Sequence, residues 1–256
     1  MIARRWCEAA YSTRLRSALA KGPLPRHVGL IMDGNRRWAR QAGFVDASVG
    51  HRHGANHLET VLGWCDHVDI AHVTVYVASA DNLRKRPGVE VSALLGLIEQ
   101  ILPKALNAPT SPWALRTVGA LDLLPTSTAA ALKECVELTR GRPRQVRLGI
   151  GYDPHEEITE AFRALLNERD EEGTSIADVA GALTVEDVGS HLTTSHDPDI
   201  DLIIRTSGEQ RVSGFFPWQS TRADLHVCDV YWPAFREIDF LRALRTYAAR
   251  RSAAGR

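Results

Sequence analysis

Short apolar runs alternate with longer amphipathic stretches along most of this 256-residue chain. The apolar runs are rich in β-branched residues, and some, such as VGLIM and VTVYVA, contain almost no polar side chain. Runs of this kind are typical of strands in a sheet that is covered on both faces. The pattern predicts strands at His27–Met32, His72–Ala78, Leu115–Gly119, Gln145–Tyr152, Leu202–Thr206 and Ala223–Val227.

The stretches between these runs have apolar residues at helical spacing, and alternation of strands with helices is typical of α/β folds. We therefore predict a mostly parallel central sheet of about six strands flanked by helices. The first residues read as a separate amphipathic helix that ends at Gly22-Pro23-Leu24-Pro25. This divides the chain into an N-terminal helix over residues 1–26 and one larger domain over residues 27–256. The helices of that domain are expected at Gly50–His67, Val89–Leu106, Thr126–Arg140, Pro154–Arg169 and Glu237–Arg250, with 170–174 as a charged surface connection.

Composition narrows the class of protein. Lysine plus arginine and aspartate plus glutamate each total 31, so no net field attracts nucleic acid, although a local basic site stays possible. The longest apolar runs are too short to cross a bilayer, and the N-terminus lacks the apolar core of a secretory signal. The four cysteines are far apart in the sequence, which argues against a zinc ribbon or disulfide framework and favours the cytoplasm.

Ligands of open α/β sheets bind where strands end and loops lead into helices. The first such junction reads Asp33-Gly34-Asn35-Arg36-Arg37-Trp38. Glycine lets an oxyanion approach the backbone, and the two guanidinium groups suit phosphate oxygens. An aspartate amid this positive charge indicates Mg²⁺ bridging carboxylate and diphosphate. The alternative is that Asp33 and Asn35 cap the following helix.

The second junction follows the fifth predicted strand and carries Arg205, Arg211 and Ser213 around a Ser-Gly turn. Two guanidinium groups and hydroxyl donors on one short loop also suit a diphosphate. The alternative is a solvated loop whose arginines pair with Glu209 and neighbouring acids.

Two other clusters are weaker candidates for metal sites. His51, His53 and His57 lie on one predicted helix, but His51 points away from the other two and nothing completes a tetrahedral zinc set. The alternating aspartates at 197, 199 and 201 mimic a calcium loop, yet Leu202 stands where its glycine belongs. We interpret these aspartates as a surface loop or helix cap.

Three segments resemble the cis-prenyltransferase family, whose best-known members make undecaprenyl diphosphate. They are HVGLIMDGNRRWAR, Gly50-His51-Arg52, and RTSGEQRVSGFFPWQS followed by WPAF. Tyr76 and residues 79–83 resemble the family's aromatic-containing strand and its Ser-x-Glu-Asn-aromatic motif. The likeness runs from about His27 to Phe240 and is strongest to actinobacterial short-chain members that make cis-farnesyl diphosphate.

The resemblance implies Mg²⁺, an apolar tunnel, a homodimer, and two substrates: an allylic diphosphate donor and isopentenyl diphosphate. Peripheral membrane contact through the N-terminal helix is a further expectation. Asp33 would hold the metal and assist ionisation. The implied catalytic residues are Asp33, Asn35, His51 and Asn82. The implied substrate-binding residues are Gly34, Arg36, Arg37 and Trp38 for the donor, and Arg205, Arg211 and Ser213 for isopentenyl diphosphate.

Several positions depart from the family pattern, mostly in the acceptor half. Asp224 replaces the glutamate that is the family's second metal ligand, and the resemblance implies that this aspartate still binds Mg²⁺ together with Asp33. Residues 151–155 lose two glycines and an arginine. Asp46 stands where many long-chain members have a phosphate-contacting arginine, and Leu83 replaces an aromatic.

Three hypotheses stay open at this point. The leading one is chain elongation with isopentenyl diphosphate. The second keeps the donor chemistry but uses an aromatic acceptor or a second allylic diphosphate, and the third is a non-catalytic subunit. The resemblance to short-chain members implies products of about ten to fifteen carbons, and branched side chains that resist displacement in a close-packed interior would stop elongation there. The predicted helix at Val89–Leu106 would present Leu94, Leu95, Ile98 and Leu102 to the growing chain.

Overall fold

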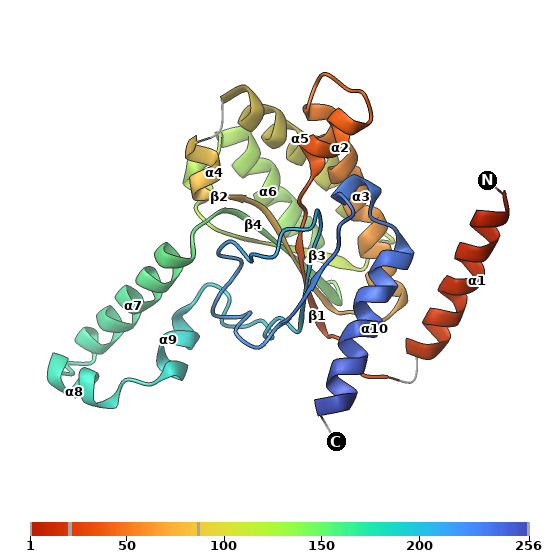
Figure 1. Cartoon of the computed structure of the whole chain (residues 1–256). Helices are drawn as coiled ribbons and strands as arrows, with labels where there is room; N and C mark the ends of the chain where they lie inside the picture. Colours follow the sequence, from red (N-terminus) through yellow and green to blue (C-terminus); the bar gives the residue numbers. More distant parts are fainter. Residues whose placement is uncertain (1, 20–21, 86–87, 255–256) are drawn as a thin grey trace.

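A computed structural model describes residues 2–19, 22–85 and 88–254 of the chain (Figure 1). Its centre is a six-stranded parallel sheet with the strand order β3-β4-β2-β1-β5-β6. The predicted fold class is thus confirmed, and each strand starts and ends within two residues of its expected bounds. The strands are β1 (His27–Ile31), β2 (His72–Ser79), β3 (Trp113–Val118), β4 (Arg144–Tyr152), β5 (Leu202–Arg205) and β6 (Asp224–Val227).

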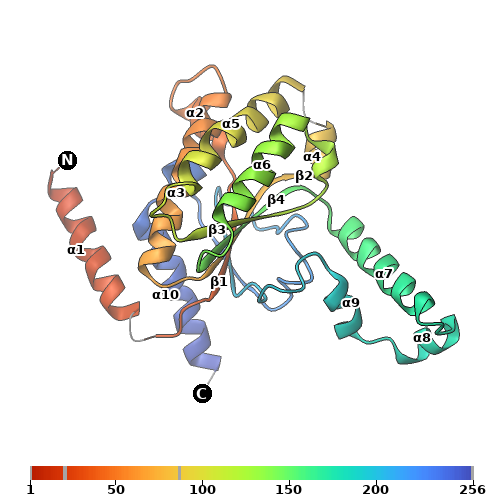
Figure 2. The ribbon, with the colours of Figure 1, turned by 180° about the vertical axis from the view of Figure 1, so that it is seen from behind.

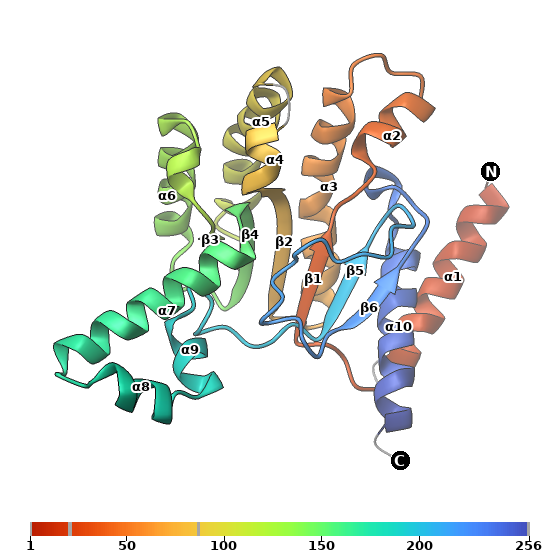
Figure 3. The ribbon, with the colours of Figure 1, turned by 60° about the vertical axis from the view of Figure 1, so that its left-hand side comes forward.

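One face of the sheet is covered by helices, as Figures 2 and 3 show from two sides. Alternate strand residues such as Val28, Leu30, Val73 and Val75 point to this face, where they form one apolar core with the helices. All five helices predicted for the larger domain are present. Those on this face are α3 (Ser48–His67), α5 (Gly88–Leu106), α6 (Thr126–Thr139) and α10 (Glu237–Ala254).

The other face is covered by the long segment between β5 and β6. Phe215 and Phe216 are fully buried there, and Phe216 stacks on Tyr152 at a centroid distance of 4.2 Å. Gly29 of β1 makes this possible, because a Cβ at position 29 would lie 2.5 Å from the Phe215 ring. The loop that carries the second arginine junction is therefore anchored by its own aromatic residues.

An arm of three helices projects from one side of the sheet (Figures 1 and 3). It consists of α7 (Pro154–Glu171), α8 (Ile176–Ala182) and α9 (Val185–His191). Helix α7 packs on α9 through Ala161, Leu165, Val188 and Leu192. Helix α7 ends at Glu171, so the first two residues of the predicted surface connection at 170–174 belong to its last turn.

The shortest helices were missed by the sequence pattern: α4 (Ala80–Lys85), α8 and α9 have at most seven residues. Segments this short show too few turns for a helical period. Only their capping residues indicate these helices in the sequence. The Ser175 side chain caps α8, and Thr184 and Asp187 form a capping box on α9.

The N-terminal helix α1 (Ile2–Leu19) packs against α10. Leu15 and Leu19 are 4% and 3% exposed, and Arg16 Nη2 lies 2.5 Å from Glu237 Oε1. This helix is therefore joined to the main body, and its two buried leucines are not available to another surface.

The aspartates at 197, 199 and 201 were expected in a surface loop or a helix cap. This expectation was wrong for Asp197, which is buried. Its carboxylate forms an ion pair with Arg147, and both side chains are 5% exposed. Asp201 Oδ2 accepts hydrogen bonds from the backbone N–H groups of Arg26 and His27 at 2.8 and 3.1 Å. Both carboxylates bind partners within the fold.

Candidate active site

A cavity of about 830 Å³ opens at the carboxyl ends of the central strands and extends between the sheet, α3 and α5. Part of its lining is polar and comes from the two predicted junctions, whereas the rest is apolar. The polar lining includes Asp33, Asn35, Arg36, Arg37, His51, Asn82, Arg205 and Ser213. The apolar lining includes Leu58, Leu62, Leu94, Leu97, Ile98, Ile101, Leu102, Leu106, Val146 and Leu148.

Asp33 joins the two junctions. Its Oδ2 accepts hydrogen bonds from Arg205 Nε at 2.9 Å and from Arg205 Nη2 at 2.6 Å. Arg205 Nη1 donates to Ser213 Oγ at 3.2 Å. Because the Arg205 side chain is only 6% exposed, its charge depends on this carboxylate for compensation.

The backbone of the first junction is held by Thr206, at the start of the second junction, and by Trp232, which follows β6. Thr206 Oγ1 and the Trp232 N–H both donate to the Asp33 carbonyl, at 2.8 and 3.0 Å. Helix α2 (Asn35–Gln41) starts directly afterwards without a side-chain cap. The alternative that Asp33 and Asn35 cap this helix is therefore wrong.

Asn35 faces the cavity from the first turn of α2. Its Nδ2 donates to the Met32 carbonyl at 3.2 Å, while its Oδ1 is buried and accepts no hydrogen bond from the part of the chain that the structure describes. Gly54 of α3 leaves room for this amide, since a Cβ there would lie 2.4 Å from Asn35 Oδ1. The site thus contains a buried acceptor that a ligand donor could satisfy.

The basic side chains around the mouth have partners on two elements, the loop after β5 and helix α5. Arg37 Nη2 donates to Ser207 Oγ at 2.8 Å. Arg36 Nη1 and His51 Nε2 lie 3.6 and 3.8 Å from the two carboxylate oxygens of Glu90 on α5. Sequence reasoning missed Glu90, because its position in an amphipathic helix gives no sign that it faces another element.

Asn82 lies at the mouth on α4, where its backbone N–H donates to Ser79 Oγ at 3.0 Å. Trp38 does not line the cavity. Its ring instead lies 4.8 Å from that of His53 and stacks on Phe44 at 6.1 Å. These ring contacts indicate that Trp38 stabilises the outer side of α2.

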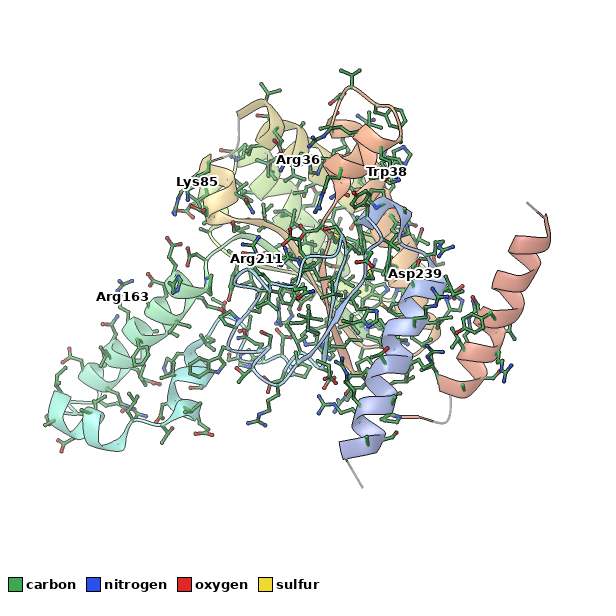
Figure 4. All side chains as sticks on the ribbon, in the orientation of Figure 1. Arg36, Trp38, Lys85, Arg163, Arg211 and Asp239 are labelled. Atoms are coloured by element: carbon green, nitrogen blue, oxygen red, sulfur yellow. The ribbon has the colours of Figure 1, made fainter. Side chains whose placement is uncertain are left out.

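The structure leaves Arg211 outside the cavity. Its side chain is 79% exposed, and Nη2 lies 3.3 Å from Glu209 Oε2 (Figure 4). The second junction is therefore divided: Arg205 and Ser213 line the cavity, whereas Arg211 has the solvated pairing that the alternative foresaw.

Asp224 lies at the opposite end of the sheet from the cavity. In the strand register Asp224 pairs with Leu202 and Leu202 with Val28, five residues before Asp33. At about 3.3 Å per residue this separation is roughly 16 Å, far too long for two carboxylates to share one ion within this chain. Asp224 instead lies 3.5 Å from Arg250 and 3.7 Å from Arg251, so the implied metal role is corrected.

The three helical histidines are also dispersed. His53 packs on Trp38, and His57 packs edge-on against Trp64 and Trp232. Burial lowers the pKa of His57. Across residues 2–19, 22–85 and 88–254, no group of three or more histidine, cysteine, aspartate or glutamate side chains is placed to hold a metal ion.

The apolar part of the cavity differs in detail from the prediction. Leu94, Ile98 and Leu102 line it as expected, but Leu95 packs elsewhere in the core. Leu97 and Ile101 complete the surface that α5 presents. Since the lining side chains are mostly branched and apolar, this part of the cavity suits a short hydrocarbon chain.

A parallel α/β fold with anion-binding groups at the mouth of a partly apolar cavity suits a substrate with an anionic head and an apolar tail. Residues 31–255 match the prenyltransferase family described as "Putative undecaprenyl diphosphate synthase", and the chain belongs to this family. The resemblance inferred from the motifs is thereby confirmed, and the protein is an enzyme of the prenyltransferase class.

Two relatives and one solved structure illustrate the similarity. An isoprenyl transferase of Streptomyces fradiae is 54% identical over 245 residues, which cover 94% of this chain and 95% of that protein. A (2Z,6E)-farnesyl diphosphate synthase of Mycobacterium tuberculosis is 44% identical over 249 residues, covering 96% and 94%. The crystal structure of lavandulyl diphosphate synthase from Lavandula x intermedia, in complex with dimethylallyl diphosphate, has a TM-score of 0.81 at 28% identity, covering 88% and 95%.

None of the helices in the described parts of the chain is long and apolar enough to span a membrane.

Proposed function

We propose that this protein is a cis-prenyltransferase that condenses a short allylic diphosphate with isopentenyl diphosphate. The reaction would release diphosphate and form a cis double bond in a short prenyl diphosphate. The observation that carries the proposal is the Asp33–Arg205 contact, which unites two arginine-bearing loops at one cavity with an apolar interior. This arrangement offers two neighbouring anion sites and a single place for hydrocarbon.

The donor diphosphate would bind at the first junction. Gly34 allows close approach of its oxygens, Arg36 and Arg37 supply positive charge, and His51 adds a hydrogen-bonding ring. The amide of Asn35 would lie beside the carbon from which diphosphate departs. These groups stabilise the negative charge that develops on the leaving group.

The residues at the mouth fit Mg²⁺. Asp33 keeps 37% of its side chain exposed, and only its Oδ2 contacts Arg205. Mg²⁺ is commonly held by one or two carboxylates plus substrate phosphates, so Asp33 and the donor diphosphate form a suitable ligand set. The bound ion would supply Lewis-acid stabilisation of the departing diphosphate.

Isopentenyl diphosphate would bind at the second junction through Arg205, Ser213 and Arg211. Arg205 and Ser213 already line the cavity, whereas Arg211 would have to leave Glu209 and turn inward. Asn82 would contribute from α4 to the condensation. Holding both substrates in one cavity provides the proximity that a bimolecular condensation requires.

The product would contain about ten to fifteen carbons, because branched residues of α3 and α5 line the apolar part of the cavity and resist displacement. The relatives named as (2Z,6E)-farnesyl diphosphate synthases support this expectation. An assay should use labelled dimethylallyl, geranyl and farnesyl diphosphates with and without isopentenyl diphosphate, followed by chromatography against cis and trans standards. Long polyprenyl products would refute the length, and donor consumption that requires an aromatic acceptor would refute the acceptor.

We also propose that the enzyme acts as a cytoplasmic homodimer. Free Cys65, Cys135 and Cys228 are compatible with a reducing compartment. On the projecting arm, Ile176 and Val185 are 74% and 67% exposed, which favours that arm as the contact between subunits. Analytical ultracentrifugation would test this, because a monomer at micromolar concentration contradicts the proposal.

A further inference from the structure

Residues 230–232, just before and within the 3₁₀ helix η2 (Trp232–Ala234), lie between the two diphosphate-binding junctions. The Val230 carbonyl accepts a hydrogen bond from the Ser207 N–H at 2.8 Å, and the Trp232 N–H donates to the Asp33 carbonyl at 3.0 Å. The backbone on either side of Tyr231 is therefore fastened to a different junction.

The Tyr231 ring itself lies against the first junction. Gly34 has φ of +99°, and a Cβ there would lie 2.6 Å from Tyr231 Cδ1. The guanidinium carbon of Arg37 lies over the same ring, 5.4 Å from its centroid. A cation at this distance from an aromatic face is attracted to the ring quadrupole.

Arg37 thus has two fixed contacts although its side chain is exposed: the Tyr231 ring and the Ser207 hydroxyl at 2.8 Å. Ser207 holds its hydroxyl there from a left-handed backbone conformation, with φ of +74°, which is uncommon for a residue other than glycine. A free arginine loses much rotamer entropy when it binds a ligand, and a side chain that is ordered beforehand loses less.

We propose that Tyr231 is a positioning residue of the donor site, which acts by holding the Arg37 guanidinium in its diphosphate-binding orientation. This inference rests on the proposed function, since it takes Arg37 as a contact of the allylic diphosphate. The aromatic face carries the effect, and the phenol hydroxyl has no part in it. Tyr231 is not among the residues that line the cavity, so it acts through Arg37.

The test compares Tyr231→Leu, which removes the aromatic face and keeps apolar volume beside Gly34, with Tyr231→Phe as the matched control. Tyr231→Leu should raise the KM for the allylic diphosphate about 5- to 30-fold, while the KM for isopentenyl diphosphate stays within about twofold. Tyr231→Phe should stay within about twofold of the wild type for both substrates. Equal rises in both KM values, an effect on kcat alone, no effect, or a phenylalanine variant as weak as the leucine variant would each overturn the proposal.

A double-mutant cycle shows whether Tyr231 acts through Arg37. In an Arg37→Ala background, Tyr231→Leu should cause no further rise in the KM for the donor, whereas a full additional effect overturns the proposal. Thermal unfolding should accompany each variant. If Tyr231→Leu does not fold, Tyr231→Met takes its place with the same expected results, since an unbranched side chain adapts more easily to the site.

Calorimetric titration with inorganic pyrophosphate and Mg²⁺ separates this inference from the proposed function. Tyr231→Leu should weaken pyrophosphate binding, and Tyr231→Phe should not. If condensation fails in the wild type but this difference appears, the proposed function is refuted and the positioning role stands. Equal pyrophosphate affinity in the wild type and the leucine variant overturns the positioning role whatever the activity.

Discussion

At the carboxyl ends of β1 and β5, Asp33 and Arg205 face a cavity, whereas at the amino ends of the same strands His27 and Asp201 bind partners within the protein. His27 is 1% exposed, with Nδ1 2.8 Å from the Pro198 carbonyl and Nε2 2.8 Å from Thr74 Oγ1. Asp201 accepts its hydrogen bonds from backbone N–H groups. The polar groups at the amino end thus have internal partners, and those at the carboxyl end keep atoms available to a ligand.

A charged residue next to a strand is therefore informative about function only once its end of the sheet is known. Residues at the carboxyl edge should affect turnover more than stability, and residues at the amino edge should do the reverse. Three substitutions and one pH titration test this difference between the two edges.

The largest effect is expected for Asp33→Asn. Loss of the carboxylate charge should lower kcat on the order of 10³-fold, because the leaving diphosphate loses its metal-mediated stabilisation. Asparagine keeps an acceptor for Arg205 but not the compensating charge, so thermal unfolding must accompany the assay to separate a loss of kcat from a loss of folding. Asp201→Asn is the matched control at the amino edge and should keep near-normal kcat. A drop of only a few-fold, with unchanged Mg²⁺ dependence, would remove Asp33 from the mechanism.

Arg211→Ala should act on one substrate only. Loss of a charge-assisted contact should raise the KM for isopentenyl diphosphate by about 10- to 100-fold and leave the KM for the allylic donor nearly unchanged. Since Arg211 is exposed, its removal should not alter the melting temperature. Steady-state kinetics with each substrate varied in turn would decide this, and equal weakening of both would contradict the assignment.

Lowering the pH should destabilise the folded protein through His27, at the amino edge of the sheet. Burial lowers the pKa of His27 to about 3, from 6.5 for an unburied histidine. Below about pH 6.5 the unfolded chain therefore binds a proton that the folded chain does not, so the free energy of unfolding falls on acidification, by up to about 1.4 kcal/mol per pH unit.

Denaturant titrations between pH 7 and pH 5 would measure this slope. His72 and His57 also have pKa values lowered by burial and contribute in the same direction. His27→Gln should make the free energy of unfolding depend less steeply on pH, because glutamine does not take up a proton on unfolding. An identical slope in the wild type and the variant would show that His27 is not the group responsible.

The smallest effect is expected for Asp224→Ala. The Mg²⁺ concentration for half-maximal rate should match that of the wild type, because Asp224 lies at the amino edge. Loss of its partly exposed pairs with Arg250 and Arg251 should cost less than about 1 kcal/mol of stability. A higher Mg²⁺ requirement would place Asp224 in the metal site and contradict the comparison.

Strands β1, β2 and β5 could be predicted because most of their residues are apolar, and a period is not needed to find them. The first junction was equally visible, since Asp33, Gly34 and Arg37 combine charge and glycine directly after a strand. The expected contact face of α5 was only partly right, because Leu95 and Leu97 are both buried and only the register against α3 and the sheet decides which lines the cavity.

The remaining misses concern partners that are distant in the sequence. The pairing of Asp197 with Arg147 depends on how the segment before β5 crosses β4, which no local pattern encodes. Tyr231 is similarly hidden, because its effect depends on Gly34 and Arg37, nearly two hundred residues earlier in the chain.

Because α1 packs on α10, this helix finds its partner in a helix that is synthesised much later: Arg16 and Glu237 are 221 residues apart in the sequence. Until then Leu15 and Leu19 have no surface to cover them, and the Arg16–Glu237 ion pair cannot form. Contacts of such long sequence separation close late in folding, since the intervening chain must be ordered first. Nascent chains of this enzyme therefore expose an apolar stripe during synthesis, and a truncation that removes α10 would leave that stripe exposed permanently.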